Sequence, residues 1–302
     1  MFANRARCRA IRPTLGVVSL PRIPPVVKWP GSKRSVAARL AAEFPPTGKF
    51  FDPFVGGGAI LPFRVGTPTI AGDTIPELIG LWTALKHSPS AVAAGYEERW
   101  NELQKIGHTA FYDIRSRFND SRHPLDLLFL SRTCVNGLIR FNARGDFNNS
   151  LHHTRPGISP QRLRRVILEW SAWLQDVTFA AADYRETLSV ARPGDFVFLD
   201  PPYTATKGRY HKTSFDLVAF FSELERLNAI GVRWMLTFDG SAGARTYSHD
   251  LPSELYDHTF AVATGHSPFP RLQNARVDAV SESVFLNFEP IPKAQGQLMD
   301  AA

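Results

Sequence analysis

The sequence has only two cysteines, Cys8 and Cys134, among its 302 residues. Two thiols provide neither a disulfide framework nor a metal-binding set, which suits a protein of a reducing compartment. No apolar stretch approaches the ~20 residues that would span a bilayer. For that reason we expect no membrane association. The nine histidines show no ligand spacing, so we expect no bound metal either.

Residues 1–27 lack acids and are rich in arginine and proline. A transit peptide has this composition, but we favour a loose leader, or a start codon placed too early. Residues 291–302 have the composition of a flexible tail. The chain carries a formal net charge of +7, from 35 Lys+Arg against 28 Asp+Glu. This modest excess favours a polyanionic partner without establishing one.

Short apolar runs alternate with helical patterns near the start of the sequence. "GKFFDPF" and "TPTIAGD" indicate strands, and between them "GGGAILPF" indicates a glycine turn that opens a helix. A helix with Pro76 in its first turn follows. This βαβ pattern predicts an α/β fold with a parallel sheet, covered by helices on both faces.

Between residues 89 and 174 helical patterns dominate, around a polar loop that contains "IRFNARGDFNNSLHHTRPG". In the last helix, apolar residues at helical spacing predict a core-facing side: Leu163, Val166, Ile167, Trp170 and Leu174. Strand patterns then return. We therefore expect a sheet domain made of residues 28–88 and 175–290, interrupted by a mostly helical insertion over residues 89–174.

The stretch "FVFLDPPY" places Asp200, Pro201, Pro202 and Tyr203 directly after a buried strand, where open α/β sheets bind ligands. An exocyclic amine such as that of adenine has two N–H donors and a delocalised lone pair. The Asp200 carboxylate and the rigid Pro201 carbonyl can each accept a hydrogen bond from one of these N–H groups. The two bonds draw the nitrogen towards tetrahedral geometry and free its lone pair. Tyr203 offers a stacking face. A strand that merely ends in a proline turn is the minority interpretation.

Three weaker patterns accompany this one. "FDPFVGGGAI" is either a loop whose glycines let the backbone approach a ligand closely or a tight strand-to-helix turn. Its spacing fits neither a P-loop nor a dinucleotide fingerprint. Asp73 ends the next strand, where a carboxylate grips a ribose, or it caps a helix. "KWPGSK" is a surface turn, or an aromatic wall with a lysine beside a carboxylate-bearing ligand.

Together these motifs resemble the Dam-type, alpha-group DNA adenine N(6)-methyltransferases, over roughly residues 27–288. The resemblance implies a Rossmann-like methyltransferase sheet that binds S-adenosyl-L-methionine and methylates a flipped adenine in double-stranded DNA. Methyl transfer would be an in-line displacement assisted by alignment. By motif, the cofactor residues would be Trp29, Lys33, Phe54, Gly56, Gly58, Asp73, Asp183 and Asp200, and the catalytic residues Asp200, Pro201, Pro202 and Tyr203.

The insertion carries a further resemblance. "LSRTCVNGLIRFNARGDFN", residues 130–148, is similar to the stretch with which the family's target-recognition domain contacts DNA. Arg140, Asn142, Arg144 and Arg155 would contact DNA phosphates or bases, and Phe141 would fill the space left by the flipped base. Each could equally be a solvated surface residue. "FNNSLHH" departs from the family pattern and leaves the target sequence open.

Several alternatives stay open. RNA adenine and cytosine exocyclic-amine methyltransferases use similar chemistry, and a degenerate copy would bind DNA without methylating it. Asp200 argues against a protein-glutamine methyltransferase, and the glycine loop with Asp73 argues against a non-enzymatic DNA-binding module. We expect a monomeric enzyme of bacterial or phage type that lies in the cytoplasm and associates with the nucleoid. A cognate restriction endonuclease is a possible partner.

Overall fold

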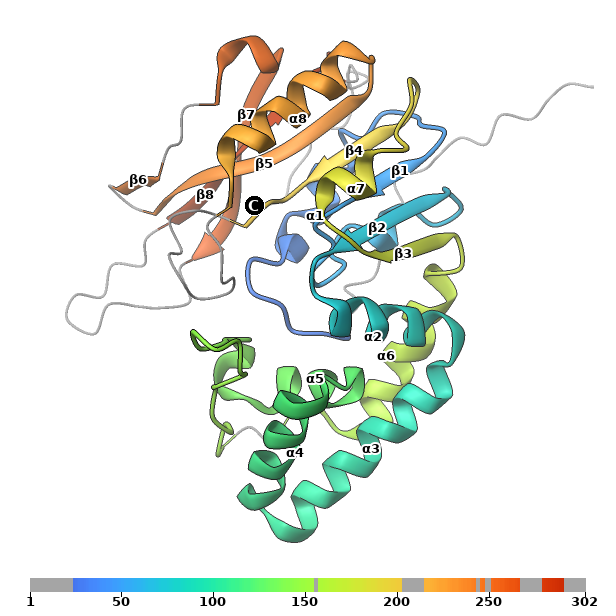
Figure 1. Ribbon diagram of the computed structural model, residues 1–302, viewed down its shortest axis with the longest axis vertical. Coiled ribbons are helices and arrows are strands. Elements are labelled where there is room, and N and C mark those ends of the chain that lie inside the picture. The colour runs from blue at the N-terminus through green and yellow to red at the C-terminus, as the bar shows by residue number, and fades with distance from the viewer. Residues whose placement is uncertain are drawn as a thin grey trace, which may run out of the picture.

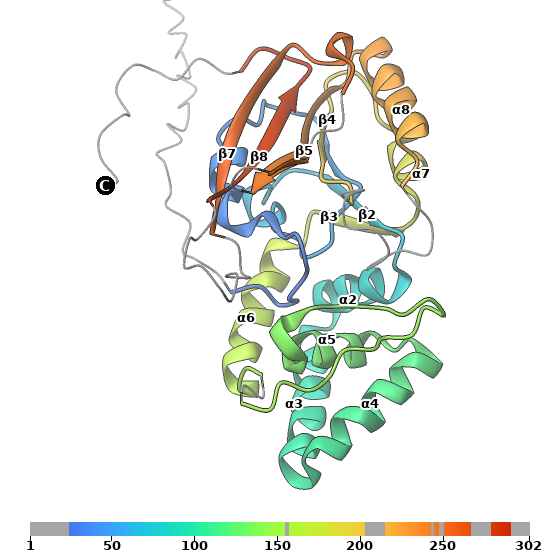
Figure 2. The ribbon, with the colours of Figure 1, turned by 90° about the vertical axis from the view of Figure 1, so that its left-hand side faces the viewer.

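The computed structural model describes residues 24–154, 157–202, 215–242, 245–247, 251–266 and 279–290. Figure 1 shows a twisted sheet with helices against it in the upper half, and a group of helices below. Figure 2 shows the same arrangement from the side, with the blue N-terminal segment lying between the two halves.

Among the described residues, one sheet has the strand order β3-β2-β1-β4-β5-β8-β7, with β6 paired to β5. The first five strands of this order are parallel, and β8 runs antiparallel to β5 and β7. The predicted parallel α/β sheet is confirmed for β1 to β5, and an antiparallel part completes it. The strands are β1 Phe50–Asp52, β2 Thr69–Asp73, β3 Val177–Ala181, β4 Phe196–Leu199, β5 Arg233–Ala242, β6 Arg245–Tyr247, β7 His258–His266 and β8 Ala279–Leu286.

Helices cover both faces of the sheet, because alternate side chains of each strand enter different cores. Phe50 and Phe196 pack on the face of α1. Phe51 and Val197 pack on the opposite face, under α7 and α8. The helices are α1 Ala37–Ala41, α2 Pro76–His87, α3 Pro89–Ile106, α4 His108–Ser121, α5 Pro124–Thr133, α6 Pro160–Trp173, α7 Tyr184–Leu188 and α8 Leu217–Ala229, with 3-10 helices η1 Lys33–Ser35, η2 Leu61–Phe63, η3 Val135–Gly137 and η4 Ser253–Leu255.

The glycine-rich segment after β1 does not open an α-helix, which corrects the sequence prediction. It leads into the 3-10 helix η2, where Phe63 N donates to Ile60 O at 3.0 Å. Gly66 then adopts a φ of 78°, which ends the turn. β2 begins three residues after Gly66, at Thr69.

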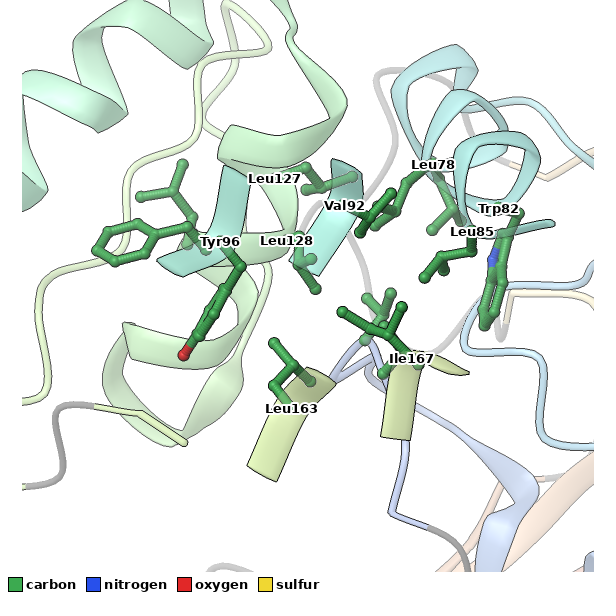
Figure 3. Close-up of a cluster of buried hydrophobic side chains, with 14 of the residues drawn as sticks. Leu78, Trp82, Leu85, Val92, Tyr96, Leu127, Leu128, Leu163 and Ile167 are labelled. Carbon is green, nitrogen blue, oxygen red and sulfur yellow. The ribbon is translucent and has the colours of Figure 1, made fainter. Parts of the chain in front are cut away.

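The lower helices share one apolar core, shown in Figure 3. α2, α3, α5 and α6 each begin with a proline, whose fixed φ suits the first helical position and whose missing N–H costs nothing there. The predicted core face of the last of these helices is confirmed: Leu163, Val166, Ile167, Trp170 and Leu174 are all buried. Within the described residues, no helix is both long enough and apolar enough to cross a bilayer.

This core does not stop at the domain boundaries expected from the sequence. Leu78, Trp82 and Leu85 of α2 belong to it, so the expected division at residue 88 cuts through packed side chains. Val26 and Val27 are buried in it as well. Trp170 Nε1 of α6 donates to the backbone carbonyl of Pro24, two residues before Val26, at 3.0 Å. The folded body therefore already includes residues 24–27 and does not start at Lys28.

Candidate active site

Three carboxylates lie at the edge of the sheet where the parallel strands end. Asp52 ends β1, Asp73 ends β2, and Asp200 directly follows β4. The chain runs from β1 to β2 on one side, while β4 is the neighbour of β1 on the other. This topological switch point is where open α/β sheets bind ligands. Short apolar strands that each end in an acid therefore produce an acidic edge.

Asp200 is held by two donors that meet the same carboxylate oxygen. Lys33 Nζ lies 2.7 Å from Asp200 Oδ1, and Thr237 Oγ1 donates to that oxygen at 2.9 Å. Thr237 is buried on β5, one residue beyond the pairing of Leu199 with Leu236. Pro201 is buried and Pro202 half-buried, while Tyr203 lies outside the described residues.

Lys33 comes from the motif "KWPGSK" and lies in η1, with only 3% of its side chain exposed. Besides Asp200, its ammonium contacts Glu282 Oε1 of β8 at 3.4 Å and the carbonyl of Gly31 at 3.2 Å. A buried ammonium is stable only when it is paired and hydrogen-bonded, and these oxygens provide both. The lysine therefore lies between two carboxylates of the protein itself.

Asp52 is a site residue that the sequence reasoning missed, although it lies inside the quoted motif "FDPF". Its side chain is buried, and its Oδ1 atom has no hydrogen-bond partner in the part of the chain that the structure describes. Burial raises the pKa of Asp52 well above its ordinary range, and the negative charge of Asp200 raises it further. Its position at the end of a strand, before a glycine loop, was the available signal.

The glycine loop passes closely beneath aromatic rings. Gly56 has a φ of 43°, and a Cβ atom there would lie 2.8 Å from the Trp29 ring. Trp82 Nε1 donates to Gly56 O at 3.0 Å. Gly58 has a φ of 66°, and a Cβ there would lie 2.9 Å from the Trp82 ring. Only glycine fits these positions, so the loop is a tightly packed cradle as well as a turn.

Asp73 fixes this loop through its carboxylate, which accepts from Gly56 N at 3.2 Å and from Ile75 N at 3.1 Å. Burial raises the pKa of Asp73 to about 6, although these backbone hydrogen bonds act in the opposite direction. A carboxylate has about four acceptor positions, so these backbone groups do not use all of its capacity. The two interpretations of Asp73 are therefore compatible, because it orders the backbone and keeps acceptor capacity.

Two further predicted cofactor residues lie at the same edge. Asp183 caps α7 by accepting from Arg185 N at 3.0 Å, and it also pairs with Arg185 Nε at 2.8 Å. Ala182 N donates to Asp73 O, which brings this loop against the end of β2. Phe54 stacks on Tyr184, with ring centroids 5.5 Å apart. Both are near the acids, but each has a structural role of its own.

The predicted recognition loop forms a short hairpin closed by pairing of Phe141 with Phe147. Asn142 Oδ1 accepts from the backbone N–H groups of Arg144 and Asp146, both at 2.9 Å, so this side chain builds the turn. Phe141 packs on Phe147 and is half-buried. It is therefore part of a small core and does not project as a free wedge.

The two arginines of the hairpin differ in their contacts. Arg140 Nε donates to Asn148 Oδ1 across the hairpin at 2.8 Å. Arg144, at the tip, is 85% exposed and pairs with Asp146 at 3.1 Å. Arg155 lies outside the described residues. In Figure 1 the green hairpin lies on the same side of the molecule as the carboxyl ends of β4 and β5.

Comparison with known proteins agrees with this geometry. Residues 29–261 match the family D12 class N6 adenine-specific DNA methyltransferase. The chain is similar to the Retron Ec67 DNA adenine methylase of Escherichia coli, with 29% identity over 63% of this chain and 67% of that protein. It is also similar to the DNA adenine methylase of Serratia marcescens, with 29% identity over 63% of this chain and 73% of the relative.

A third relative is the type II methyltransferase M1.LlaDCHI of Lactococcus lactis subsp. cremoris, with 26% identity over 75% of this chain and 85% of the relative. The family match spans most of the chain, from the lysine-bearing turn through the acidic edge to β7. The chain therefore belongs to the D12 class of N6 adenine-specific DNA methyltransferases.

Proposed function

We propose that the acidic edge binds S-adenosyl-L-methionine and that Asp200 accepts a hydrogen bond from the exocyclic amine of a target adenine beside it. The observation that carries this proposal is the Asp200 carboxylate, fixed at the switch point by Lys33 and Thr237 through one oxygen. The ion pair and the hydrogen bond both meet Oδ1, and we expect Oδ2 to face the substrate.

The residues at this edge suit a cationic cofactor. Asp52 lies within electrostatic reach of Asp73 and Asp200, and Lys33 pairs with Asp200. The orphaned Oδ1 of Asp52 would accept from a cationic amine, and the glycine loop would let a ligand approach the backbone closely. When bound, the cofactor supplies an electrophilic methyl group on a positively charged sulfur.

The chain's own residues would then align the acceptor. Asp200 Oδ2 and the Pro201 carbonyl would accept hydrogen bonds from the two amine N–H groups of the base, which concentrates its lone pair on nitrogen. Asp73 would hold ribose hydroxyls, while Trp29, Phe54 and Asp183 would line the cofactor. Most of the rate enhancement would come from alignment of the reacting atoms.

The hairpin would contact duplex DNA and support flipping of the adenine, which costs a few kcal/mol. Arg144 is the best-exposed candidate for a phosphate or base contact, because its tip position leaves most of the side chain accessible. Arg140 would join it if its bond to Asn148 opened. We expect the enzyme to act as a monomer on cytoplasmic DNA, with a restriction endonuclease as an optional partner.

The test is methyl transfer from labelled S-adenosyl-L-methionine to unmethylated duplex DNA, with Asp200→Ala as the comparison. We expect the wild-type chain to label adenine and the variant to lose at least ~10³-fold in rate, because it removes the acceptor of the reacting amine. Equal methylation by the two proteins would overturn the assignment. Single-molecule sequencing of DNA from a methylation-free host that expresses the chain would report the modified base and its sequence context.

A further inference from the structure

The orientation of Asp200 depends on residues that lie outside the motifs of this site. A carboxylate rotates about a broad, roughly two-fold torsion, so it does not hold one oxygen towards a substrate by itself. In this protein two donors, Lys33 Nζ and Thr237 Oγ1, both contact Oδ1. Two donors on one oxygen define which oxygen is left for the amine.

Thr237 is placed for this purpose by the sheet. The parallel pairing of β4 with β5 puts Leu199 opposite Leu236, so the next residue on β5 lies beside Asp200. The Thr237 side chain is fully buried, and its hydroxyl lies 2.9 Å from Asp200 Oδ1 and 3.3 Å from Leu199 O. The shorter distance makes the carboxylate the better acceptor, and its charge strengthens the bond.

Glu282 acts on the other donor. The antiparallel pairing of β8 with β5 puts Glu282 opposite Gly240, beyond the end of β4. Its Oε1 lies 3.4 Å from Lys33 Nζ, and its side chain is 15% exposed. With Glu282 present, the ammonium divides its charge between two carboxylates. Without it, one carboxylate fewer would share the ammonium, whose stronger attraction to Asp200 would weaken that group as an acceptor of the amine hydrogen bonds.

We infer that Thr237 and Glu282 are positioning residues for methyl transfer. Thr237 fixes the rotation of the Asp200 carboxylate directly, and Glu282 fixes the location and electrostatic effect of Lys33. This inference rests on the proposed role of Asp200 as acceptor of the target amine. Neither residue touches the reacting atoms. Because both act through the orientation and charge environment of Asp200, we expect their substitution to change the rate of methyl transfer and not the affinity for the ligands.

Single-turnover methylation with excess full-length enzyme tests the inference. Thr237→Val removes the donor at almost constant volume, and Thr237→Ser keeps it. We expect the valine variant to lose ~10–100-fold in the methyl-transfer rate, the usual effect of one hydrogen bond to a charged group. Affinities for S-adenosyl-L-methionine and DNA should stay within about twofold. The serine variant should recover most of the rate.

Glu282→Gln should likewise slow the transfer step, by ~10-fold, with affinities unchanged, since it removes one charge near Lys33. Thr259→Val and Glu254→Gln, at exposed positions, are the matched controls and should behave as wild type. A folded Thr237→Val variant with the wild-type transfer rate, or a serine variant as slow as valine, would refute the positioning role alone. A wild-type chain that binds the cofactor but methylates no DNA would overturn the proposed function and this inference together.

Discussion

At the scale of single residues, burial changes the protonation of Asp73 at the sheet edge. Asp73 is largely ionised only above pH 6, because burial raises its pKa to about 6. The unfolded value is 3.8, so ionisation of Asp73 opposes folding. This cost in folding free energy is absent below pH 3.8 and fully present above pH 6. A ligand that donates hydroxyl groups to the carboxylate would offset it.

This behaviour predicts how cofactor affinity depends on pH. Between pH 7 and pH 5 the dissociation constant for S-adenosyl-L-methionine should rise by up to ~10-fold, because protonation removes acceptor capacity from Asp73. Isothermal titration calorimetry across this range measures it. Asp73→Asn should bind weakly at every pH and lose most of the pH dependence, while Asp257→Asn, an exposed control, should follow wild type. An unchanged pH slope in Asp73→Asn would contradict the assignment.

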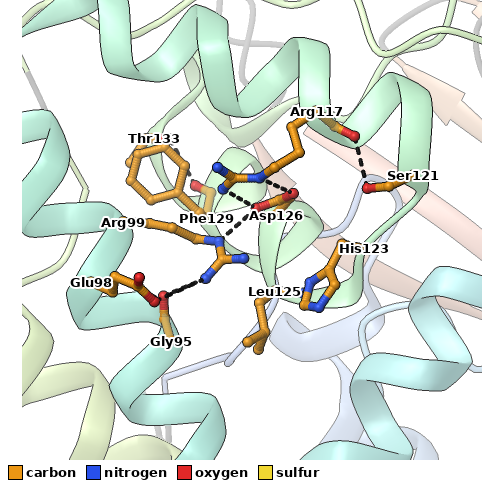
Figure 4. A network of polar contacts seen from close by, with 10 residues as sticks. All are labelled: Gly95, Glu98, Arg99, Arg117, Ser121, His123, Leu125, Asp126, Phe129 and Thr133. Atoms are coloured by element: carbon orange, nitrogen blue, oxygen red, sulfur yellow. Dashed lines mark hydrogen bonds and ion pairs between the residues drawn. The ribbon is translucent and has the colours of Figure 1, made fainter.

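At the scale of elements, three helices are joined by one buried carboxylate, shown in Figure 4. Asp126 of α5 is fully buried and accepts from Arg99 Nε of α3 at 2.6 Å and from Arg117 Nη2 of α4 at 2.7 Å. Burial alone would raise the pKa of Asp126, but the hydrogen bonds from the two arginines outweigh it and hold the pKa below its ordinary value. The network fixes α4, whose Asn119 binds the recognition hairpin at Phe147 N, 2.7 Å away.

Asp126→Asn should therefore destabilise the helical region strongly. We expect the free energy of unfolding at pH 7 to fall by about 3 kcal/mol, since the change removes the buried charged partner of Arg99 and leaves it only the exposed Glu98, 4.0 Å away. Urea denaturation followed by circular dichroism measures this difference. Asp113→Asn, on the exposed side of α4, is the control and should change the value by less than about 0.5 kcal/mol. A similar small change in Asp126→Asn would show that the network adds little stability.

Much of this arrangement could be predicted from local sequence, because apolar runs that end in acids define strand ends. Asp73 and Asp200 were found in this way. Thr237 and Glu282 could not be, since their roles depend on strand pairing that brings residue 282 against residue 33. The same limit applies to Asn142: a sequence motif does not reveal that its amide oxygen is used within the turn.

At the scale of the whole molecule, the N-terminal segment belongs to the fold. Val26 and Val27 enter the core that α2, α3, α5 and α6 share, and Arg132 Nη1 donates to Pro25 O at 3.0 Å. The expected boundary at residue 27 cuts through this core because the apolar "VV" is too short to show a period, and its burial depends on helices that lie between residues 76 and 173.

Two truncations separate this segment from what precedes it. A chain that begins at Pro24 should have the same free energy of unfolding as the full-length protein. A chain that begins at Lys28 should lose about 3 kcal/mol or more of unfolding free energy, since each buried valine contributes roughly 1.5–3 kcal/mol. Chemical denaturation of the two proteins compares them. Equal midpoints would show that Val26 and Val27 contribute little to the core.

The position of β8 has a consequence for synthesis of the protein. β8 is inserted between β5 and β7 in space, although it is the last of the described strands to be made. A ribosome-bound chain can pair strands β1 to β5 as they are made. β7 pairs with none of these five strands and is joined to the sheet only through β8. Glu282 arrives with that strand. A nascent chain thus carries Asp200 and Lys33 well before the carboxylate of β8 can join them, and translation itself delays completion of this cluster until β8 has been made.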